Sequence, residues 1–353
     1  MSTEQQAPSP HLPVRPEWLA LHSEPALEPG LAIIDAHHHL WDHANNPYGP
    51  ADLLADAGAG HRILATVFVE CGAWYRKDGP ASLASVGETE SVNRIAKASD
   101  AAGASCRIAA GIVGNADLLL GAEVAAVLDA HLQAAPGRFK GIRNSSVYHP
   151  DPRARGSMAN PPPGLLLDPQ FRRGFACLSP RGLSFDGWMY HTQLADLVDL
   201  AQAFPGTSIV LNHVGGPIGI GPYAGKREEV FADWQLSMRQ LARCQNVSVK
   251  LGGMGMRLFG FDFASQDQPP DSHALAKAWA PYVMACIEAF GPGRCMFESN
   301  FPVDKGTASY VAIWNAFKRI TAALGADERK ALFSQTAARV YGIDLTDRGD
   351  SSP

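Results

Sequence analysis

Three residues whose types suit hydrolytic chemistry alternate near the start of the chain. Asp35, His37 and His39 lie in the segment IIDAHHHLWD. Side chains two residues apart on a β-strand project to the same face, so we expect these three to point together. Neutral imidazoles arranged in this way can bind one divalent ion, or they can polarise a carbonyl and hold a water molecule. A pair of hydrogen-bonded core histidines is the structural alternative, but the D-x-H-x-H triplet on a first strand favours a catalytic site.

The elements that must position these residues form a repeating pattern from residue 31 onward. Short β-rich runs alternate with segments whose apolar residues have helical spacing, which is typical of a parallel sheet built from βα units. Eight such runs begin at residues 31, 63, 107, 139, 182, 207, 246 and 294. The sequence therefore predicts an α/β fold, a (β/α)8 TIM barrel with an outer ring of helices.

The barrel domain is expected to span residues 31–345. Residues 1–30 are rich in Pro, Ser and Glu without periodicity, which predicts an extended N-terminal arm that Trp18 could anchor. Residues 346–353 are predicted to be a flexible tail. Two long connections rich in Pro and Gly, residues 148–170 and 253–270, follow the fourth and seventh strands and should lie on the catalytic face. They are candidates for lids or specificity walls, although plain surface loops remain an alternative.

Composition limits the classes of partner. The formal net charge is −5, with no block of like charges, which disfavours nucleic acid and anionic membranes and favours a small polar or anionic substrate. The six cysteines are scattered without a C-x-x-C pair, as expected for reduced thiols. No signal peptide or membrane-length apolar run is recognisable, so we expect a cytoplasmic protein, and a homo-oligomer remains open.

Several motifs in this order resemble those of the amidohydrolase-related family of the amidohydrolase superfamily. The similar segments are IIDAHHHLWD, GIRNS, YHTQLADLVDLA, IVLNHVGGP, VSVKLGG and MFESNFPVDK, and they extend from about residue 31 to residue 342. They are similar to the branch that contains 2-pyrone-4,6-dicarboxylate lactonase, L-fuconolactonase, L-rhamnonolactonase and 4-sulfomuconolactone hydrolase. The resemblance implies a hydrolase that opens a lactone or similar cyclic ester of a small polar or carboxylated substrate by water attack.

The resemblance also implies roles for individual residues. His37 and His39 would bind either a divalent metal or the lactone carbonyl, and His213 in LNHVGGP would be the third histidine of the set. Arg143 in GIRNS would hold substrate oxygens or a carboxylate, for which the guanidinium fork is chemically suited. A structural ion pair is the alternative for Arg143.

Two further residues match family positions on the substrate side of the site. His191 in YHTQL could bind substrate or could instead pack against the following helix. Lys250 in VSVKLGG could bind substrate or could neutralise a buried carboxylate such as Glu70.

The eighth strand departs from the family pattern. Asn300 occupies the place where the family usually has an aspartate that ligates the metal or accepts a proton, and an amide cannot be a general base near neutral pH. We therefore expect Asp304 to be the base, with Glu298 as the second choice and a histidine as the third. Glu298 could alternatively be a buried structural acid, and Asn300 would orient substrate or water.

The metal content is left open by these residues. His37, His39 and His213 with a water would satisfy one zinc-like divalent ion, yet the missing aspartate also suits a metal-independent enzyme. A metal-dependent decarboxylase of an aromatic or dienoic acid is an alternative activity, and a catalytically altered barrel that only binds a small ligand is another.

Overall fold

Eight parallel strands in the computed structural model pair in chain order, β1 to β8, and confirm the predicted (β/α)8 barrel. The structure describes residues 11–43, 46–157, 159 and 161–345. A bridge between His38 and Phe301 and a 2.7 Å hydrogen bond from His39 N to Phe301 O join β1 to the chain after β8. The strands are β1 (Ala32–His38), β2 (Arg62–Val69), β3 (Arg107–Gly114), β4 (Phe139–Arg143), β5 (Ser184–Gly187), β6 (Ile209–Leu211), β7 (Val247–Leu251) and β8 (Cys295–Phe297).

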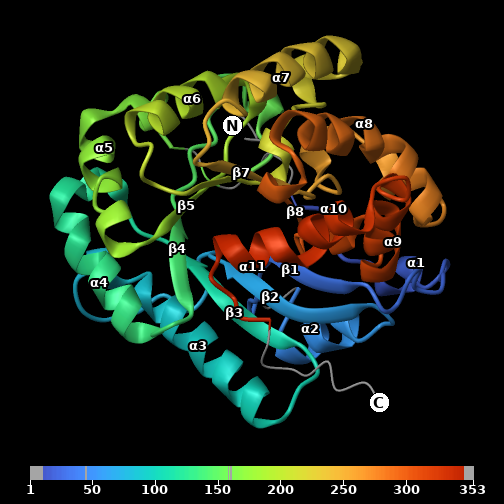
Figure 1. Ribbon diagram of the computed structural model, residues 1–353, viewed down its shortest axis with the longest axis horizontal. Coiled ribbons are helices and arrows are strands. Elements are labelled where there is room, and N and C mark those ends of the chain that lie inside the picture. The colour runs from blue at the N-terminus through green and yellow to red at the C-terminus, as the bar shows by residue number, and fades with distance from the viewer. Residues whose placement is uncertain (1–10, 44–45, 158, 160, 346–353) are drawn as a thin grey trace, which may run out of the picture.

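Helices surround the strands, and one short helix crosses an end of the barrel (Figure 1). The predicted outer ring of helices includes α3 (Val86–Ala101), α4 (Val124–Ala134), α6 (Leu194–Ala203), α7 (Arg227–Leu241), α8 (Ser272–Phe290) and α9 (Tyr310–Ile320). The shorter helices are α1 (Pro16–Leu19), α2 (Pro50–Ala57), α5 (Pro169–Phe175), α10 (Ala326–Lys330) and α11 (Thr336–Val340). No helix in the described part of the chain is both long and apolar enough to cross a membrane.

The strands are buried on both faces, which explains their continuous apolar sequences. One face packs against the helices, and the other fills the barrel interior. Interior side chains include Ile34, Ala36, Val67, Val69, Val210 and Met296. All six cysteines carry free thiols, and four of them are buried.

Strict alternation fails along β1, and this corrects the expected orientation of Asp35. The pairing of β1 with β2 shifts register between Asp35 and His38. The Asp35 carboxylate consequently faces α9, where it accepts hydrogen bonds from Ser299 Oγ at 2.6 Å and Tyr310 Oη at 3.0 Å. Asp35 therefore supports the junction of β1, β8 and α9 instead of pointing with His37 and His39.

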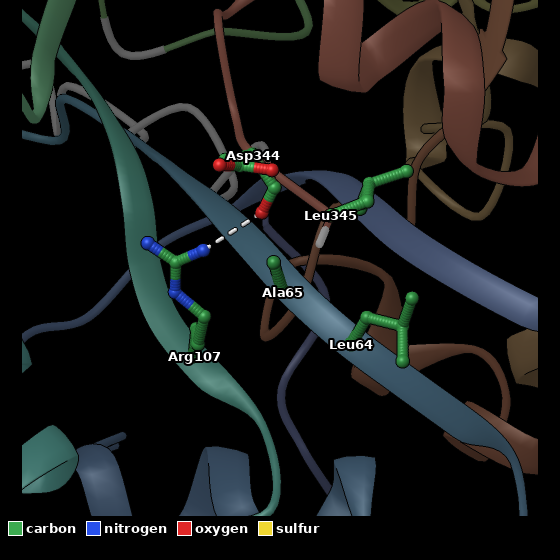
Figure 2. A pocket seen from close by; sticks show the side chains of 5 residues that line it. All are labelled: Leu64, Ala65, Arg107, Asp344 and Leu345. Atoms are coloured by element: carbon green, nitrogen blue, oxygen red, sulfur yellow. Dashed lines mark hydrogen bonds between the residues drawn. The ribbon is translucent and has the colours of Figure 1, made fainter. Parts of the chain in front are cut away.

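Two hollows lie at the N-terminal ends of the strands, away from the histidines. The first, of about 20 Å³, is lined by Leu64, Ala65, Arg107, Asp344 and Leu345, and Arg107 Nη1 donates to Asp344 O at 2.9 Å across it (Figure 2). The second, of about 310 Å³, lies between the C-terminal end of α6 and the segment that follows α7. Neither offers the clustered titratable side chains that hydrolysis needs.

Tyr341, which directly follows α11, closes the interior of the barrel beneath the site. Its hydroxyl lies 2.9 Å and 3.1 Å from the two carboxylate oxygens of Asp186 on β5. Both residues are buried. The hydroxyl therefore helps to satisfy a carboxylate that has no access to water.

Replacing Tyr341 by Phe should lower the free energy of unfolding by about 1–3 kcal/mol, because Asp186 loses a donor in a dry interior. Urea denaturation followed by circular dichroism measures the change. Tyr148→Phe is the matched control, since that tyrosine is only half-buried, and its effect should stay below about 0.5 kcal/mol. Equal stability of Tyr341→Phe and wild type would contradict the structural role of this hydroxyl.

Candidate active site

Three buried histidines meet at the C-terminal end of the barrel. His37 and His39 come from the end of β1, and His213 begins the turn η7 (His213–Gly215) after β6. The Nε2 atoms of His37 and His39 are 3.2 Å apart, and the ring centroids of His37 and His213 are 4.6 Å apart. The structure thus brings together the histidines that the sequence singled out.

Glu298 lies between two of these histidines. Its Oε1 is 2.8 Å from His213 Nδ1 and also accepts the His213 backbone N–H at 3.1 Å. Its Oε2 is 2.9 Å from His37 Nδ1. His39 has a separate partner, because its Nδ1 is 2.8 Å from Val69 O. His213 and His39 thus use Nδ1 in hydrogen bonds, which leaves Nε2 of these two rings for a metal or substrate.

Burial controls the charge of this cluster. Desolvation lowers the pKa of His37, His39 and His213 well below the usual value, so these rings are neutral at pH 7. Desolvation raises the pKa of Glu298 to about 8, although Lys250 and the His213 N–H act in the opposite direction. A carboxylate in this position would be stabilised by a nearby cation.

Two glycines after β7 leave space for the cluster. A Cβ on Gly252 would lie 2.4 Å from Glu298 Cγ, and one on Gly253 would lie 2.3 Å from His213 Nδ1. Gly253 also has φ +68°. The Gly-Gly pair in VSVKLGG is therefore required by the side chains of neighbouring strands, a requirement that sequence reasoning missed.

Arg143 reaches the cluster while it is held from behind. Its Nε donates to Glu70 Oε1 at 2.7 Å, and its Nη2 donates to Glu70 O. Its Nη1 lies 3.4 Å from His37 Nε2. The ion pair with Glu70 and a role toward substrate are therefore compatible, because the pair fixes one side of the guanidinium and leaves Nη1 facing the histidines.

Lys250 pairs with a carboxylate that the sequence analysis did not single out. Its Nζ donates to Asp186 Oδ2 at 2.7 Å, whereas Glu70 is taken by Arg143. Asn212, next to His213, donates its Nδ2 to the same Asp186 oxygen at 3.1 Å. Lys250 Nζ is also 3.4 Å from His37 Nδ1. The suggested Lys250–Glu70 pair is wrong, because Lys250 is paired with Asp186 on β5 and Glu70 is paired with Arg143 on β4.

Asn300 and Asp304 form a second polar unit beyond β8. Asn300 Nδ2 donates to Asp304 Oδ1 at 2.8 Å, and Gly255 N donates to Oδ2 at 2.9 Å. Desolvation raises the pKa of Asp304 to about 8, against the lowering effect of these two donors. The Asn300 amide nitrogen is thus hydrogen-bonded to Asp304, and each carboxylate oxygen of Asp304 keeps a further lone pair.

His191 supports a loop beside the site. Its Nδ1 accepts from Ile218 N at 3.3 Å, and its own backbone N–H donates to Gly216 O at 3.1 Å. Its ring lies edge-on to Tyr223, with centroids 5.3 Å apart. These contacts connect the loop after β5 to the loop after β6, so His191 has a structural role. Its contact with substrate stays a prediction.

Backbone strain marks the same region. His213, Val214 and Asn300 have φ of 52°, 47° and 54°, values that non-glycine residues adopt only at a cost of roughly 1–3 kcal/mol each. Such strain is typical of sites where the fold must aim a side chain.

The donor set in this cluster suits one divalent ion. His37, His213 and Glu298 each have a possible ligand atom, and these atoms lie within 4.8 Å of one another. His39 Nε2 lies 3.2 Å from His37 Nε2, so either Glu298 or His39 can complete the set of ligands. Nitrogen and carboxylate ligands are those that zinc prefers. A buried carboxylate with a raised pKa beside neutral imidazoles adds an electrostatic reason for a cation to bind here.

An eight-stranded barrel with polar side chains clustered at the C-terminal ends of its strands is the typical arrangement of a barrel enzyme. A family profile described as "Amidohydrolase" matches residues 34–343. The chain therefore belongs to the amidohydrolase family and is a hydrolase.

Relatives of this chain include named lactonases. The protein y4mH of Sinorhizobium fredii is 35% identical over 335 residues, which cover 89% of this chain and 99% of that protein. L-fucono-1,5-lactonase of Burkholderia multivorans is 27% identical, covering 89% of this chain and 97% of that enzyme. L-rhamnono-gamma-lactonase of Scheffersomyces stipitis is 24% identical over a shorter match, 57% of this chain and 62% of that enzyme.

Solved structures agree with the fold. An amidohydrolase from Burkholderia multivorans with bound zinc superposes with a TM-score of 0.66 and 25% identity. The match covers 89% of this chain and 100% of the Burkholderia chain. A 2-pyrone-4,6-dicarboxylic acid hydrolase from Pseudomonas putida has a TM-score of 0.61 at 18% identity, covering 89% and 99% of the two chains, and shows the shared fold.

Replacing Gly253 by Ala should lower kcat/KM for the hydrolysis that this enzyme catalyses by at least about 100-fold, because the new methyl group would displace the His213 ring and misplacement of about 1 Å has effects of this size. Gly293→Ala is the control, since a Cβ there meets nothing within 4 Å. Circular dichroism verifies that both variants fold. Full activity of folded Gly253→Ala would show that His213 need not occupy this position.

Proposed function

We propose that this protein hydrolyses a sugar lactone or a similar cyclic ester with the help of one divalent ion held by His37, His39 and His213. The observation that carries the proposal is the position of Glu298, whose Oε1 is hydrogen-bonded to His213 Nδ1 at 2.8 Å and whose Oε2 lies 2.9 Å from His37 Nδ1. A carboxylate that holds a histidine by its far nitrogen is the usual support of a metal-binding imidazole.

The spacing of the first two histidines supports this ligand set. Two lone-pair nitrogens 3.2 Å apart repel unless a proton or a cation lies between them. Ligands bound at about 2.0–2.1 Å in a tetrahedral site are separated by roughly 3.4 Å, which is close to that distance. His39 keeps its proton on Nδ1 for Val69 O, so its Nε2 is the available donor. When bound, the ion would make water more acidic and would stabilise the oxyanion.

The surrounding side chains supply the remaining functions. Arg143 Nη1 faces the histidines and would bind a carbonyl or carboxylate oxygen of the substrate. Asp304 would take the proton of the attacking water and later return it to the ring oxygen when the ester C–O bond breaks, which gives a hydroxy acid. Asn300 would hold Asp304 in place. Lys250 and Asp186 would fix the floor of the site as a paired charge.

The substrate class is inferred from the relatives and the charges. The relatives are named L-fucono-1,5-lactonase and L-rhamnono-gamma-lactonase, and these names give sugar lactones as their substrates. The cations near the histidines are held by carboxylates, Arg143 by Glu70 and Lys250 by Asp186, which favours a substrate with hydroxyl groups over one with several negative charges.

We expect the purified protein to open at least one member of a panel of aldonolactones that includes L-fucono-1,5-lactone, measured by acid release at constant pH. His37→Ala should abolish turnover, because it removes one ligand and breaks the contact with Glu298. Elemental analysis of protein purified without chelator should find about one divalent ion per chain. Undiminished turnover by metal-free protein would overturn the metal part of the proposal and leave a metal-independent lactonase. No turnover of any lactone would overturn the whole.

Separate variants distinguish the two carboxylates. Asp304→Asn should lower kcat by roughly 10²–10⁴-fold with metal content unchanged, which is the contribution of a positioned base. Glu298→Gln should weaken metal binding by roughly 10–100-fold, the effect expected when a partner behind a ligand is lost. Metal titration and steady-state kinetics measure both. If both variants kept full activity, a histidine would be the base, and the carboxylate roles would be wrong.

A further inference from the structure

The arm that precedes the barrel is bound to the loop that follows β7, residues 252–271. Trp18 is buried, and its Nε1 donates to Gln266 O at 2.9 Å. Arg15 Nη2 donates to Ala264 O at 2.7 Å, and the Arg15 guanidinium lies over the Trp18 ring, 4.0 Å from its centroid. Two hydrogen bonds therefore join the arm to the backbone of this loop.

The same loop supports Asp304 near its beginning. Gly255 N donates to Asp304 Oδ2 at 2.9 Å, and Thr307 Oγ1 donates to Gly255 O at 2.7 Å. A Cβ on Gly255 would lie 2.8 Å from Asp304 Cγ, so the loop backbone is in direct contact with the carboxyl group. Any shift of this loop therefore moves a hydrogen-bond donor of Asp304.

The arm also contacts the turn that carries Asp304, which is η12 (Asp304–Gly306). Gly306 is buried, and a Cβ at this position would lie 2.7 Å from Leu12 Cβ and 2.7 Å from Leu12 O. The missing side chain of Gly306 thus lets the arm lie directly on the turn. Leu12 contacts the turn and Trp18 contacts the loop, so the arm spans the two segments that surround Asp304.

The other end of the arm is fixed to α9 of the outer ring. Lys318 Nζ donates to Leu27 O at 2.6 Å and to Glu28 O at 2.9 Å. Asn315 Oδ1 accepts the Leu27 backbone N–H at 2.7 Å. Lys318 and Asn315 are both buried on α9, so the arm is held by the barrel itself before it reaches the segments around Asp304.

We propose that Leu12 and Trp18 are positioning residues that hold η12 and the loop after β7 together around Asp304 and so keep its carboxylate directed for proton transfer. This inference rests on the proposed function, in which Asp304 is the base. A base needs a fixed direction, because a displacement of about 1 Å can lower the rate by about 100-fold. Both residues lie outside residues 34–343, the part of the chain that the family profile matches.

Steady-state kinetics on the best aldonolactone of the panel test the role of Trp18. Trp18→Ala should lower kcat by about 10-fold, because the loop shifts and Asp304 loses its direction. KM should change by less than about 3-fold and the metal content should be unchanged, since no proposed contact with substrate or metal is removed. Trp18→Phe keeps an aromatic ring beneath Arg15 and should restore kcat to within about 3-fold of wild type.

A second variant and a control use other residues of the arm. Leu12→Ala removes the contact with η12, leaves the buried indole in place, and should lower kcat in the same direction as Trp18→Ala. Leu21→Ala is the control, because this leucine of the same arm is 61% exposed, and it should leave kcat and KM unchanged. Circular dichroism verifies that each variant folds. Unchanged kcat in Trp18→Ala and Leu12→Ala, or a loss confined to KM, would overturn the inference.

A double variant shows whether the arm acts through Asp304. In the Asp304→Asn background, Trp18→Ala should change kcat by less than about 2-fold, because the two substitutions remove the same contribution. A further loss of about 10-fold in that background would overturn the inference, since Trp18 would then act through another group.

Hydrogen exchange separates this inference from the proposed function, because it needs no turnover. In Trp18→Ala, a peptide covering residues 252–259, which contains the Gly255 amide, should exchange at least about 10-fold faster than in wild type, since the loop opens more often. A peptide from α4 should be unchanged. If the wild type opens no lactone, the proposed function fails, and faster exchange alone still supports the hold of the arm on this loop. Equal exchange of residues 252–259 in both proteins would overturn the inference whatever the activity.

Discussion

The buried carboxylate of Glu298 is the constraint on which the rest of the site depends. It contacts Nδ1 of His37 and of His213, and it has no access to water. A charge in this position is tolerated only with close partners, so the surrounding chain must bring them within hydrogen-bond distance. The glycines at 252 and 253 exist for this reason, because any side chain there would occupy the volume of Glu298 or His213.

The distribution of charge around Glu298 fits the divalent cation of the proposed function. Arg143 is paired with Glu70, and Lys250 is paired with Asp186, so both nearby cations already have a carboxylate of their own. Glu298 is left with neutral imidazoles, and its pKa rises to about 8. Either a proton or a metal ion can supply the missing positive charge, and a metal ion would also bind imidazole nitrogens of the cluster.

The sequence predicts most of the fold because periodicity reports burial. The eight apolar runs correspond to the eight strands, the segments of helical spacing between them correspond to helices of the outer ring, and the pair His37 and His39 follows from alternation. Alternation fails at Asp35, where a register shift in β1 turns the side chain toward α9. That shift depends on the pairing with β2, which no local pattern encodes.

Charge partners were harder to predict than elements. Asp186 lies inside a short β-rich run, GLSFDGW. An acidic residue within a buried strand indicates that a cation is buried beside it. The cation that pairs with Asp186 depends on the arrangement of the strands. It is Lys250 on β7, two strands away in the sheet. Trp18 was predicted to anchor the arm, but its partner, Gln266 O in the loop after β7, depends on tertiary packing that the local sequence does not encode.

The asparagine at position 300 is best understood together with Asp304. Its φ of 54° is a conformation that Asn adopts more readily than most residues, and its amide donates to Asp304 at 2.8 Å. An aspartate at position 300 would place two carboxylates at that distance, and one of them would have to be protonated. Asn300 therefore does not remove an acid from the site. It allows the acid to stand at position 304, four residues further along the chain, where the proposed proton transfer needs it.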